Sequence, residues 1–76
     1  MKLALIGYGA MGKEIERFCN KENIIITNIF DVDNPLEPSK CYDFDIAIEF
    51  STPETIIENV TILAKQKKNI VIGTTK

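Results

Sequence analysis

The sequence predicts a doubly wound α/β fold built on a four-stranded parallel sheet. Two observations predict it: short apolar segments alternate with segments of helical periodicity, and a glycine-rich turn joins the first apolar segment to the first helix. Strands separated by helices pair in parallel through right-handed crossovers. We therefore expect the elements in the order strand, helix, strand, loop, strand, helix, strand, and the strands in the spatial order 2-1-3-4.

The first half of the chain contains a strand, a helix and a second strand. Lys2–Ile6 is a short apolar run that ends at a glycine, as a buried strand does. β-branched residues dominate 24–30 and favour a strand there, and 31–42, with two prolines and no periodicity, is expected to be a loop. Between the two strands, apolar residues at helical spacing predict the buried stripe of a helix: Met11, Ile15, Phe18 and Cys19.

The second half repeats this order. Apolar side chains alternate in 45–50, with Ala47 on one face and Ile46, Ile48 and Phe50 on the other. The last strand is expected at 69–72. The helix between these strands should bury one apolar face, formed by Ile56, Ile57, Val60, Leu63 and Ala64.

Two starts are possible for this second helix within the segment Ser51-Thr52-Pro53-Glu54. In the first, Ser51 is the N-cap and Glu54 closes a capping box. In the second, Thr52 is the N-cap and Pro53 is the first helical residue.

Composition and charge exclude several classes of protein. Eleven acidic and nine basic residues give a net charge of -2, which argues against a nucleic-acid-binding surface. No apolar run approaches the roughly 18 residues that a membrane span needs, and the N-terminal segment is too short for a signal peptide. We therefore expect a cytoplasmic protein without a membrane partner. The chain has no histidine and only two cysteines, so it offers neither a histidine-based catalytic site nor a metal site.

The glycine-rich turn is the strongest single motif. Residues 7–12 match G-x-G-x-x-G between a predicted strand and a predicted helix, the context that identifies a Rossmann-like dinucleotide-binding unit. Gly7 permits the tight turn, Gly9 lets the backbone approach a pyrophosphate, and Gly12 allows close packing of the helix on the strand. The helix N-terminus then offers N–H groups and a partial positive charge to the phosphates.

Asp31 lies 19 residues after Gly12, at the end of the second predicted strand. The dinucleotide fingerprint expects an acid about 20 residues on, where it binds the adenosine ribose. The alternative is an ordinary aspartate in the loop that follows a strand. A ribose-binding acid would repel a 2′-phosphate, and this favours NADH over NADPH.

Ligands of doubly wound folds bind at the carboxyl ends of the strands. The glycine turn, the segment after the third strand and the segment after the fourth strand should meet there, so we expect Phe50, Ser51, Gly73, Thr74 and Thr75 near the cofactor. Glu49 ends the third strand and either accepts hydrogen bonds from loop N–H groups or points into solvent. No catalytic residue is assigned.

Three segments resemble the N-terminal cofactor domain of dihydrodipicolinate reductase: 6–13 (IGYGAMGK), 45–54 (DIAIEFSTPE) and 71–75 (VIGTT). The likeness runs in register along nearly the whole chain. It implies the diaminopimelate route to lysine and the reduction of 4-hydroxy-tetrahydrodipicolinate with NADH or NADPH. Residues implied to bind the cofactor are Gly7, Tyr8, Gly9, Ala10, Met11, Gly12, Asp31, Gly73, Thr74 and Thr75.

The resemblance also implies a further, C-terminal domain that binds the substrate, supplies the proton and forms a homotetramer. Residues 1–76 would then be a dinucleotide-binding fragment, inactive by itself. The alternative from a different class is a free-standing regulatory module that senses NAD or NADH. The two hypotheses differ in whether the natural chain continues beyond Lys76.

Overall fold

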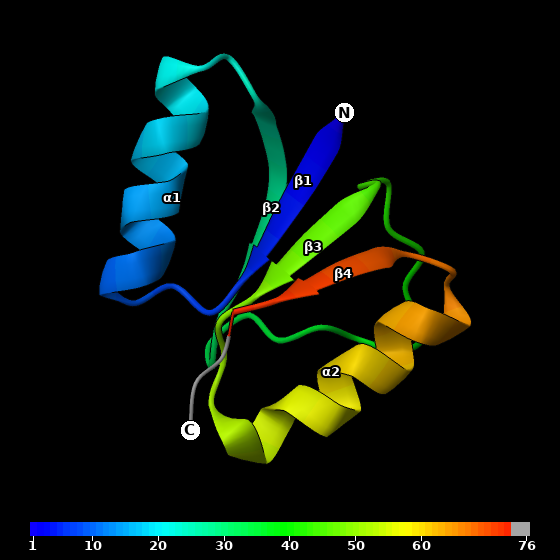
Figure 1. Ribbon diagram of the computed structural model, residues 1–76. Helices are drawn as coiled ribbons and strands as arrows, with labels where there is room; N and C mark the ends of the chain where they lie inside the picture. The colour runs from blue at the N-terminus through cyan, green and yellow to red at the C-terminus, as the bar shows by residue number, and fades with distance from the viewer. Residues whose placement is uncertain (74–76) are drawn as a thin grey trace.

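The computed structural model describes residues 1–73 and contains a single four-stranded sheet with two helices (Figure 1). The sheet is parallel, with the order β2-β1-β3-β4, as the sequence predicts. The elements along the chain are β1 (Lys2–Ile6), α1 (Ala10–Lys21), β2 (Ile25–Phe30), β3 (Ile46–Glu49), α2 (Pro53–Lys65) and β4 (Asn69–Ile72).

β1 occupies the centre of the sheet because it is apolar on both faces. It pairs with β2 on one side and with β3 on the other, and four consecutive residues, 3–6, are buried. A continuous apolar run of this kind is typical of a parallel strand that is covered on both sides. The edge strands β2 and β4 are less protected, and Ile25 and Ile72 are each more than half exposed.

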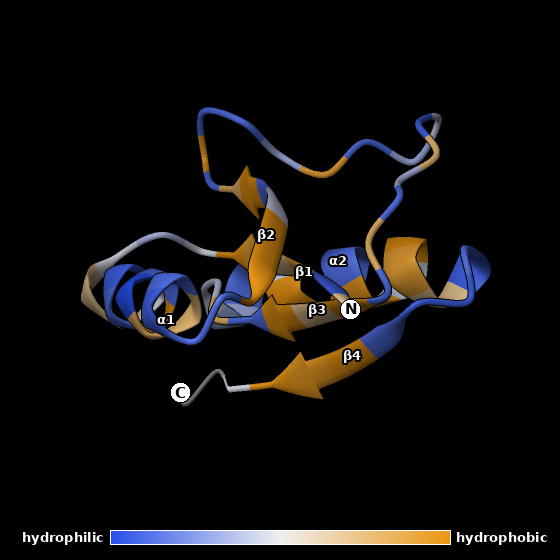
Figure 2. Cartoon of the chain, turned by 90° about the horizontal axis from the view of Figure 1, so that it is seen from above, coloured by the Kyte–Doolittle hydropathy of each residue, from blue (hydrophilic) through white to orange (hydrophobic). Residues whose placement is uncertain are grey.

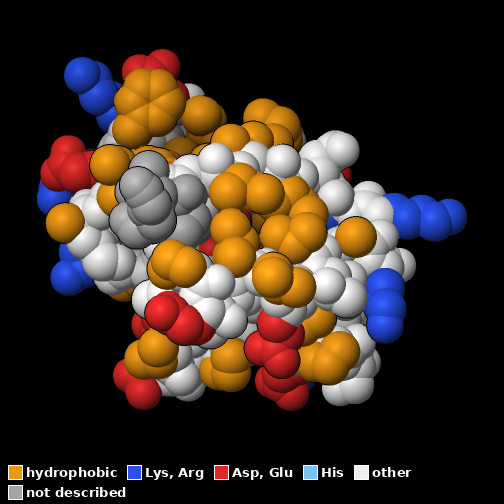
Figure 3. All heavy atoms as spheres, turned by 60° about the horizontal axis from the view of Figure 1, so that its bottom comes forward, with side chains coloured by type: hydrophobic (Ala, Val, Ile, Leu, Met, Phe, Trp, Pro, Cys, Tyr) orange, Lys and Arg blue, Asp and Glu red, His pale blue; other side chains and the backbone are white. Residues whose placement is uncertain are grey.

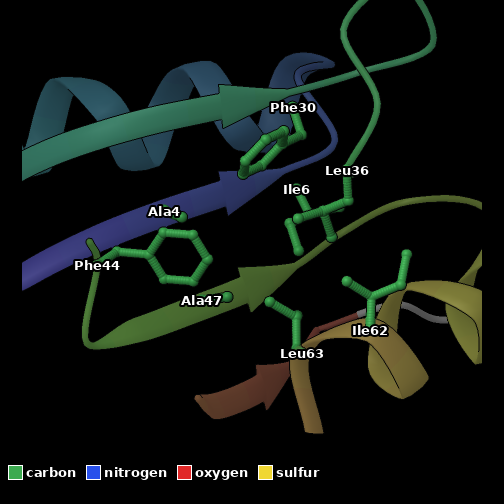
Figure 4. Close-up of a cluster of buried hydrophobic side chains, with 8 residues drawn as sticks. All are labelled: Ala4, Ile6, Phe30, Leu36, Phe44, Ala47, Ile62 and Leu63. Atoms are coloured by element: carbon green, nitrogen blue, oxygen red, sulfur yellow. The ribbon is translucent and has the colours of Figure 1, made fainter. Parts of the chain in front are cut away.

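The two helices cover opposite faces of the sheet, α1 beside β2 and α2 beside β4 (Figures 1 and 2). On one face Cys19 of α1 packs against Leu3 and Leu5. On the other face α2 and the long loop enclose the larger core cluster, drawn in Figure 4. Its buried members are Ala4, Ile6, Phe30, Leu36, Phe44, Ala47, Ile62 and Leu63.

The predicted stripe of α1 is wrong at two of its four positions. Ile15 and Cys19 face the sheet, but Met11 and Phe18 are each 58% exposed. The buried stripe starts at Gly12 instead, which packs against the turn that precedes the helix. Met11 and Phe18 each lie one residue, about 100°, around the helix from this stripe.

The predicted face of α2 is also partly wrong. Leu63 is buried as expected, whereas Ile57 is 77% exposed and Ala64 is exposed. Ile62, which the periodicity did not select, is buried because it joins the same cluster as Leu36 of the loop. The helix starts at Pro53 with Thr52 as its N-cap, so the second of the two starts is confirmed and the Ser51 start is wrong.

The loop between β2 and β3 is fixed to the body of the protein. Figure 2 shows it arching from the end of β2 towards β3, mostly hydrophilic with short hydrophobic segments. Its Tyr42 ring packs edge-on against Phe30, 5.2 Å between centroids. Lys68 Nζ donates to the carbonyl oxygens of Tyr42 and Phe44, at 2.7 Å each. These contacts hold one wall of the cavity described next.

Candidate functional site

A cavity of about 610 Å³ lies at the carboxyl ends of β1, β2 and β3. Its size falls within the range of about 300–1,000 Å³ that is usual for small-molecule sites. The lining comes from three stretches far apart in the sequence: 6–9, 30–36 and 50–59, the last of which runs from the end of β3 into α2. The crevice expected from the fold class is therefore present, and it unites the glycine turn with Asp31, Phe50 and Ser51.

The three glycines of the turn occupy three different environments, as the motif predicts. Gly7 has φ +99°, and a Cβ there would lie 2.7 Å from the carbonyl carbon of Phe50. A Cβ on Gly12 would lie 2.6 Å from the carbonyl oxygen of Gly7. A Cβ on Gly9 would meet no atom of the described residues within 4 Å. Gly7 and Gly12 are thus required by packing, whereas Gly9 leaves open space at the cavity wall.

The N-terminus of α1 begins beside this open space. Its N-cap is Gly9, which has no side chain that could cap the first N–H groups, and within the described part of the chain the first turn carries no acidic residue. The first N–H groups of a helix lack partners within the helix and attract anions. Ala10 and Met11 lie in this first turn and are exposed. The geometry suits a phosphate group here.

Tyr8 ties the glycine turn to α1. Its phenol donates to the carboxylate of Glu16, in the second turn of the helix, and Lys13 Nζ lies 5.6 Å from the centre of the Tyr8 ring. The hydrogen bond to Glu16 is the main reason that the pKa of Tyr8 is raised. Tyr8 also lines the cavity, so the contact fixes part of its wall.

Asp31 lies at the cavity and also organises the loop that follows β2. Its Oδ1 accepts the backbone N–H groups of Asp33 and Asn34, both at 2.9 Å. A carboxylate has about four acceptor sites, so this loop role leaves capacity for a ligand. The structure brings Asp31 to the same cavity as Gly7 and Gly9, the arrangement that the dinucleotide fingerprint requires.

Glu49 points into the protein and is fully buried. Its Oε1 accepts the N–H of Ser51 at 2.5 Å, and its Oε2 accepts Asn59 Nδ2 at 2.9 Å. Of the two alternatives for Glu49, hydrogen bonding to a loop N–H is confirmed. Asn59 was missed by the sequence analysis, although a polar residue between Ile56 and Leu63 on the inner side of the helix was a signal for it.

Phe50 and Gly73 are in direct contact at the end of the sheet. The N–H of Gly73 donates to the carbonyl oxygen of Glu49 at 2.9 Å, which continues the pairing of β3 with β4. Phe50 lines the cavity, whereas Gly73 lies behind its ring. Thr74 and Thr75, also predicted to bind the cofactor, lie outside the described residues.

The charge around the cavity is acidic. Of the described residues that line it, Asp31 and Glu58 are the charged ones, and none is a lysine or arginine. Figure 3, which brings the bottom of Figure 1 forward, shows apolar side chains near the middle of this side and basic side chains at its periphery. Val32, Pro35 and Leu36 supply an apolar wall that the sequence analysis did not identify.

Residues 1–73 contain neither a metal-binding cluster nor a helix that could span a membrane. No group of three or more Cys, Asp or Glu side chains there is arranged to hold a metal ion. Neither α1 nor α2 has the length and hydropathy of a membrane-crossing helix.

Comparison with known families matches residues 1–76 to the family described as "Dihydrodipicolinate reductase, N-terminus". A 4-hydroxy-tetrahydrodipicolinate reductase from Christiangramia forsetii is 38% identical over 78 residues, covering 99% of this chain and 31% of that protein. The protein of the same name from Buchnera aphidicola subsp. Baizongia pistaciae is 43% identical over 53 residues, covering 66% of this chain and 20% of that protein. One from Hahella chejuensis is 52% identical over 33 residues, 43% of this chain and 12% of that protein. The chain therefore spans about a third of the length of the first of these relatives.

Proposed function

The chain belongs to the family of dihydrodipicolinate reductase N-terminal domains, and from this we propose that it is the cofactor-binding part of a 4-hydroxy-tetrahydrodipicolinate reductase. The family is one of nicotinamide-dinucleotide-binding domains. The observation that supports the proposal best is the open space at Gly9, beside the N-terminus of α1 and in the same cavity as Asp31.

The residues present fit a dinucleotide. The N–H groups at the start of α1 would hold the pyrophosphate, and Asp31 would bind the adenosine ribose. The apolar wall at Val32 and Leu36 would then receive the adenine, because it continues the cavity beyond Asp31. The nicotinamide would lie towards Phe50, Ser51, Gly73, Thr74 and Thr75.

The acidic lining favours NADH as the cofactor. A 2′-phosphate on the adenosine ribose would lie close to the carboxylate of Asp31, and the residue after it, Val32, offers no positive charge. Repulsion between the Asp31 carboxylate and the 2′-phosphate is enough to make NADPH bind more weakly than NADH, without any additional contact.

In this proposal the cofactor supplies the hydride, and this chain binds and orients it. The substrate site, the proton donor and the tetramer contacts would belong to a further domain, in keeping with the 31% of the first relative's length that this chain spans. The reaction would serve the diaminopimelate route to lysine in the cytoplasm, and the chain alone would not catalyse it. The three relatives above are all named as reductases, so they give no support to the sensing module.

The proposal is tested by titrating the ¹⁵N-labelled chain with NADH and with NADPH while its amide signals are recorded. NADH should move the signals of 7–12, Asp31 and Ser51, and NADPH should do so more weakly. If neither dinucleotide moves these signals at millimolar concentration, the cofactor-binding role is wrong. In parallel, the natural gene product should oxidise NADH only when 4-hydroxy-tetrahydrodipicolinate is added, and its failure to do so would overturn the reductase assignment.

A further inference from the structure

Glu49 is the one charged residue among 1–73 that is completely buried. Removing a carboxylate from water is costly unless hydrogen bonds replace the lost hydration. Its side chain lies on the same face of β3 as Ala47, directed towards the larger core cluster. An apolar side chain would fill such a position without that cost, so the carboxylate calls for an explanation.

The partners of Glu49 belong to the wall of the cavity. Its two carboxylate oxygens accept from the N–H of Ser51 and from the side-chain amide of Asn59. Asn59 Nδ2 also lies 3.3 Å from Ser51 Oγ, and Thr55 Oγ1 lies 2.9 Å from the same oxygen. Ser51, Thr55 and Asn59 line the cavity, but Glu49 does not. The Glu49 carboxylate therefore fixes these lining residues from the protein interior, without facing the cavity itself.

We propose that Glu49 is a positioning residue, whose carboxylate fixes Ser51 and Asn59 in the orientation that a bound dinucleotide requires. The inference rests on the proposed function. The negative charge itself would oppose a nearby pyrophosphate, so the benefit must come from the hydrogen bonds. Two acceptors on one rigid strand define both the path of the backbone into α2 and the direction of the Asn59 amide.

The substitution Glu49→Gln keeps the size and shape of the side chain but changes its hydrogen-bonding groups. Glutamine keeps the length and one acceptor for the Ser51 N–H, but it places an NH₂ group against the NH₂ of Asn59. The Asn59 amide must then turn over or move away, which changes the atoms presented to the cavity. Glu54→Gln is the matched control, because it makes the same chemical change on an exposed residue of α2 that does not line the cavity.

The test uses ¹⁵N-labelled chains titrated with NADH and with ADP-ribose. We expect Glu49→Gln to move the Ser51 and Asn59 amide signals and to raise the Kd for NADH about fivefold to tenfold, the loss of roughly one hydrogen bond. Glu54→Gln should leave both unchanged. The inference is overturned if Glu49→Gln binds NADH as tightly as Glu54→Gln does, even though the Ser51 signal has moved.

Glu49→Asp covers the case in which the glutamine variant does not fold. It keeps the charge but shortens the reach towards Asn59, so the Asn59 amide signal should move and the Kd for NADH should rise. An unchanged Kd in a folded Glu49→Asp chain would contradict the inference. If the unsubstituted chain binds neither NADH nor ADP-ribose, the proposed function itself fails and this inference falls with it. If it binds and the Glu49 variants bind equally well, only the role of Glu49 is wrong.

Discussion

The ring of Phe50 lies directly over Gly73, so that a Cβ on Gly73 would come within 2.2 Å of Phe50 Cε1. This contact joins the ends of β3 and β4 at the point where the backbone leaves the sheet. Because Phe50 also lines the cavity, the absence of a side chain at Gly73 determines where one wall of the candidate site lies.

Gly73→Ala should therefore destabilise the protein by forcing the Phe50 ring aside. Overpacking of this kind costs about 1–3 kcal/mol, and the displaced ring should also weaken NADH binding. Urea unfolding followed by circular dichroism measures the first effect. A Gly73→Ala chain of unchanged stability would show that the Phe50 ring moves without cost.

Gly9→Ala should weaken NADH binding without a loss of stability. The new methyl group meets open space and the backbone of Gly9 is at φ -88°, which alanine adopts readily. The free energy of unfolding should change by less than about 0.5 kcal/mol, whereas the Kd for NADH should rise, because the methyl group occupies the approach to the pyrophosphate. Stability loss without an effect on binding would contradict the ligand role of Gly9.

Val32→Arg should shift the cofactor preference towards NADPH. Val32 is 92% exposed and lines the cavity directly after Asp31, so a guanidinium there can reach a 2′-phosphate without disturbing the core. A charge-assisted contact of this kind should change the ratio of the two Kd values about tenfold. Val32→Gln, uncharged, is the control and should leave the ratio unchanged. If the Arg and Gln variants have the same ratio of Kd values for NADH and NADPH, the adenosine ribose does not bind beside Val32.

Lys68→Met should loosen the loop between β2 and β3. The Lys68 ammonium donates to the carbonyl oxygens of Tyr42 and Phe44, and its loss leaves both without this donor at a cost of about 1–3 kcal/mol. Faster hydrogen exchange of 36–44 and a lower unfolding midpoint in urea would show this. Lys67→Met changes the neighbouring, exposed lysine and should have little effect. Equal effects of the two variants would show that the hydrogen bonds of Lys68 do not hold the loop in place.

The exposed pair Lys2–Asp43 should make a small, pH-dependent contribution to stability. The hydrogen bond and charge of Lys2, 2.8 Å away, hold the pKa of Asp43 below its ordinary value of 3.8, and Asp43 in turn raises the pKa of Lys2 above 10.5. The carboxyl contribution is present above its ordinary pKa and is lost as the pH falls through the lowered one. The amine contribution is present below its ordinary pKa and is lost as the pH rises through the raised one.

Asp43→Asn should accordingly lower the Tm slightly near pH 7, and the difference should shrink as the pH falls through the lowered pKa of Asp43. Thermal melts of the two proteins across this range measure the difference. A Tm difference that does not shrink as the pH falls would have to come from packing instead of charge.

The order of the elements, the sheet topology and the glycine turn could be predicted because each depends on local signals. The unalternating run of β1, the β-branched residues of β2 and the G-x-G-x-x-G spacing all act within a few residues of one another. Their combination with the handedness of crossovers then specifies the sheet.

What the sequence did not predict depends on contacts between distant segments. Ile62 is buried because Leu36, from a loop without periodicity, reaches the same cluster, and no pattern within α2 reveals that partner. Asn59 likewise acquires its role only because the end of β3 brings Glu49 beneath it. The helical period locates a stripe to within about one residue, or 100°, which is why Met11 and Phe18 were assigned to the wrong side.

Three residues, Ile6, Phe30 and Leu36, belong both to the larger core cluster and to the lining of the cavity. The floor of the cavity cannot be reshaped without opening voids in the interior that stabilises a chain of only 76 residues. Changes of ligand preference that arise by single substitutions must therefore come from the exposed rim, at positions such as Val32 and Glu58. We therefore expect members of the family to differ more in the residues of the rim than in those of the floor, because the floor residues also belong to the folding core.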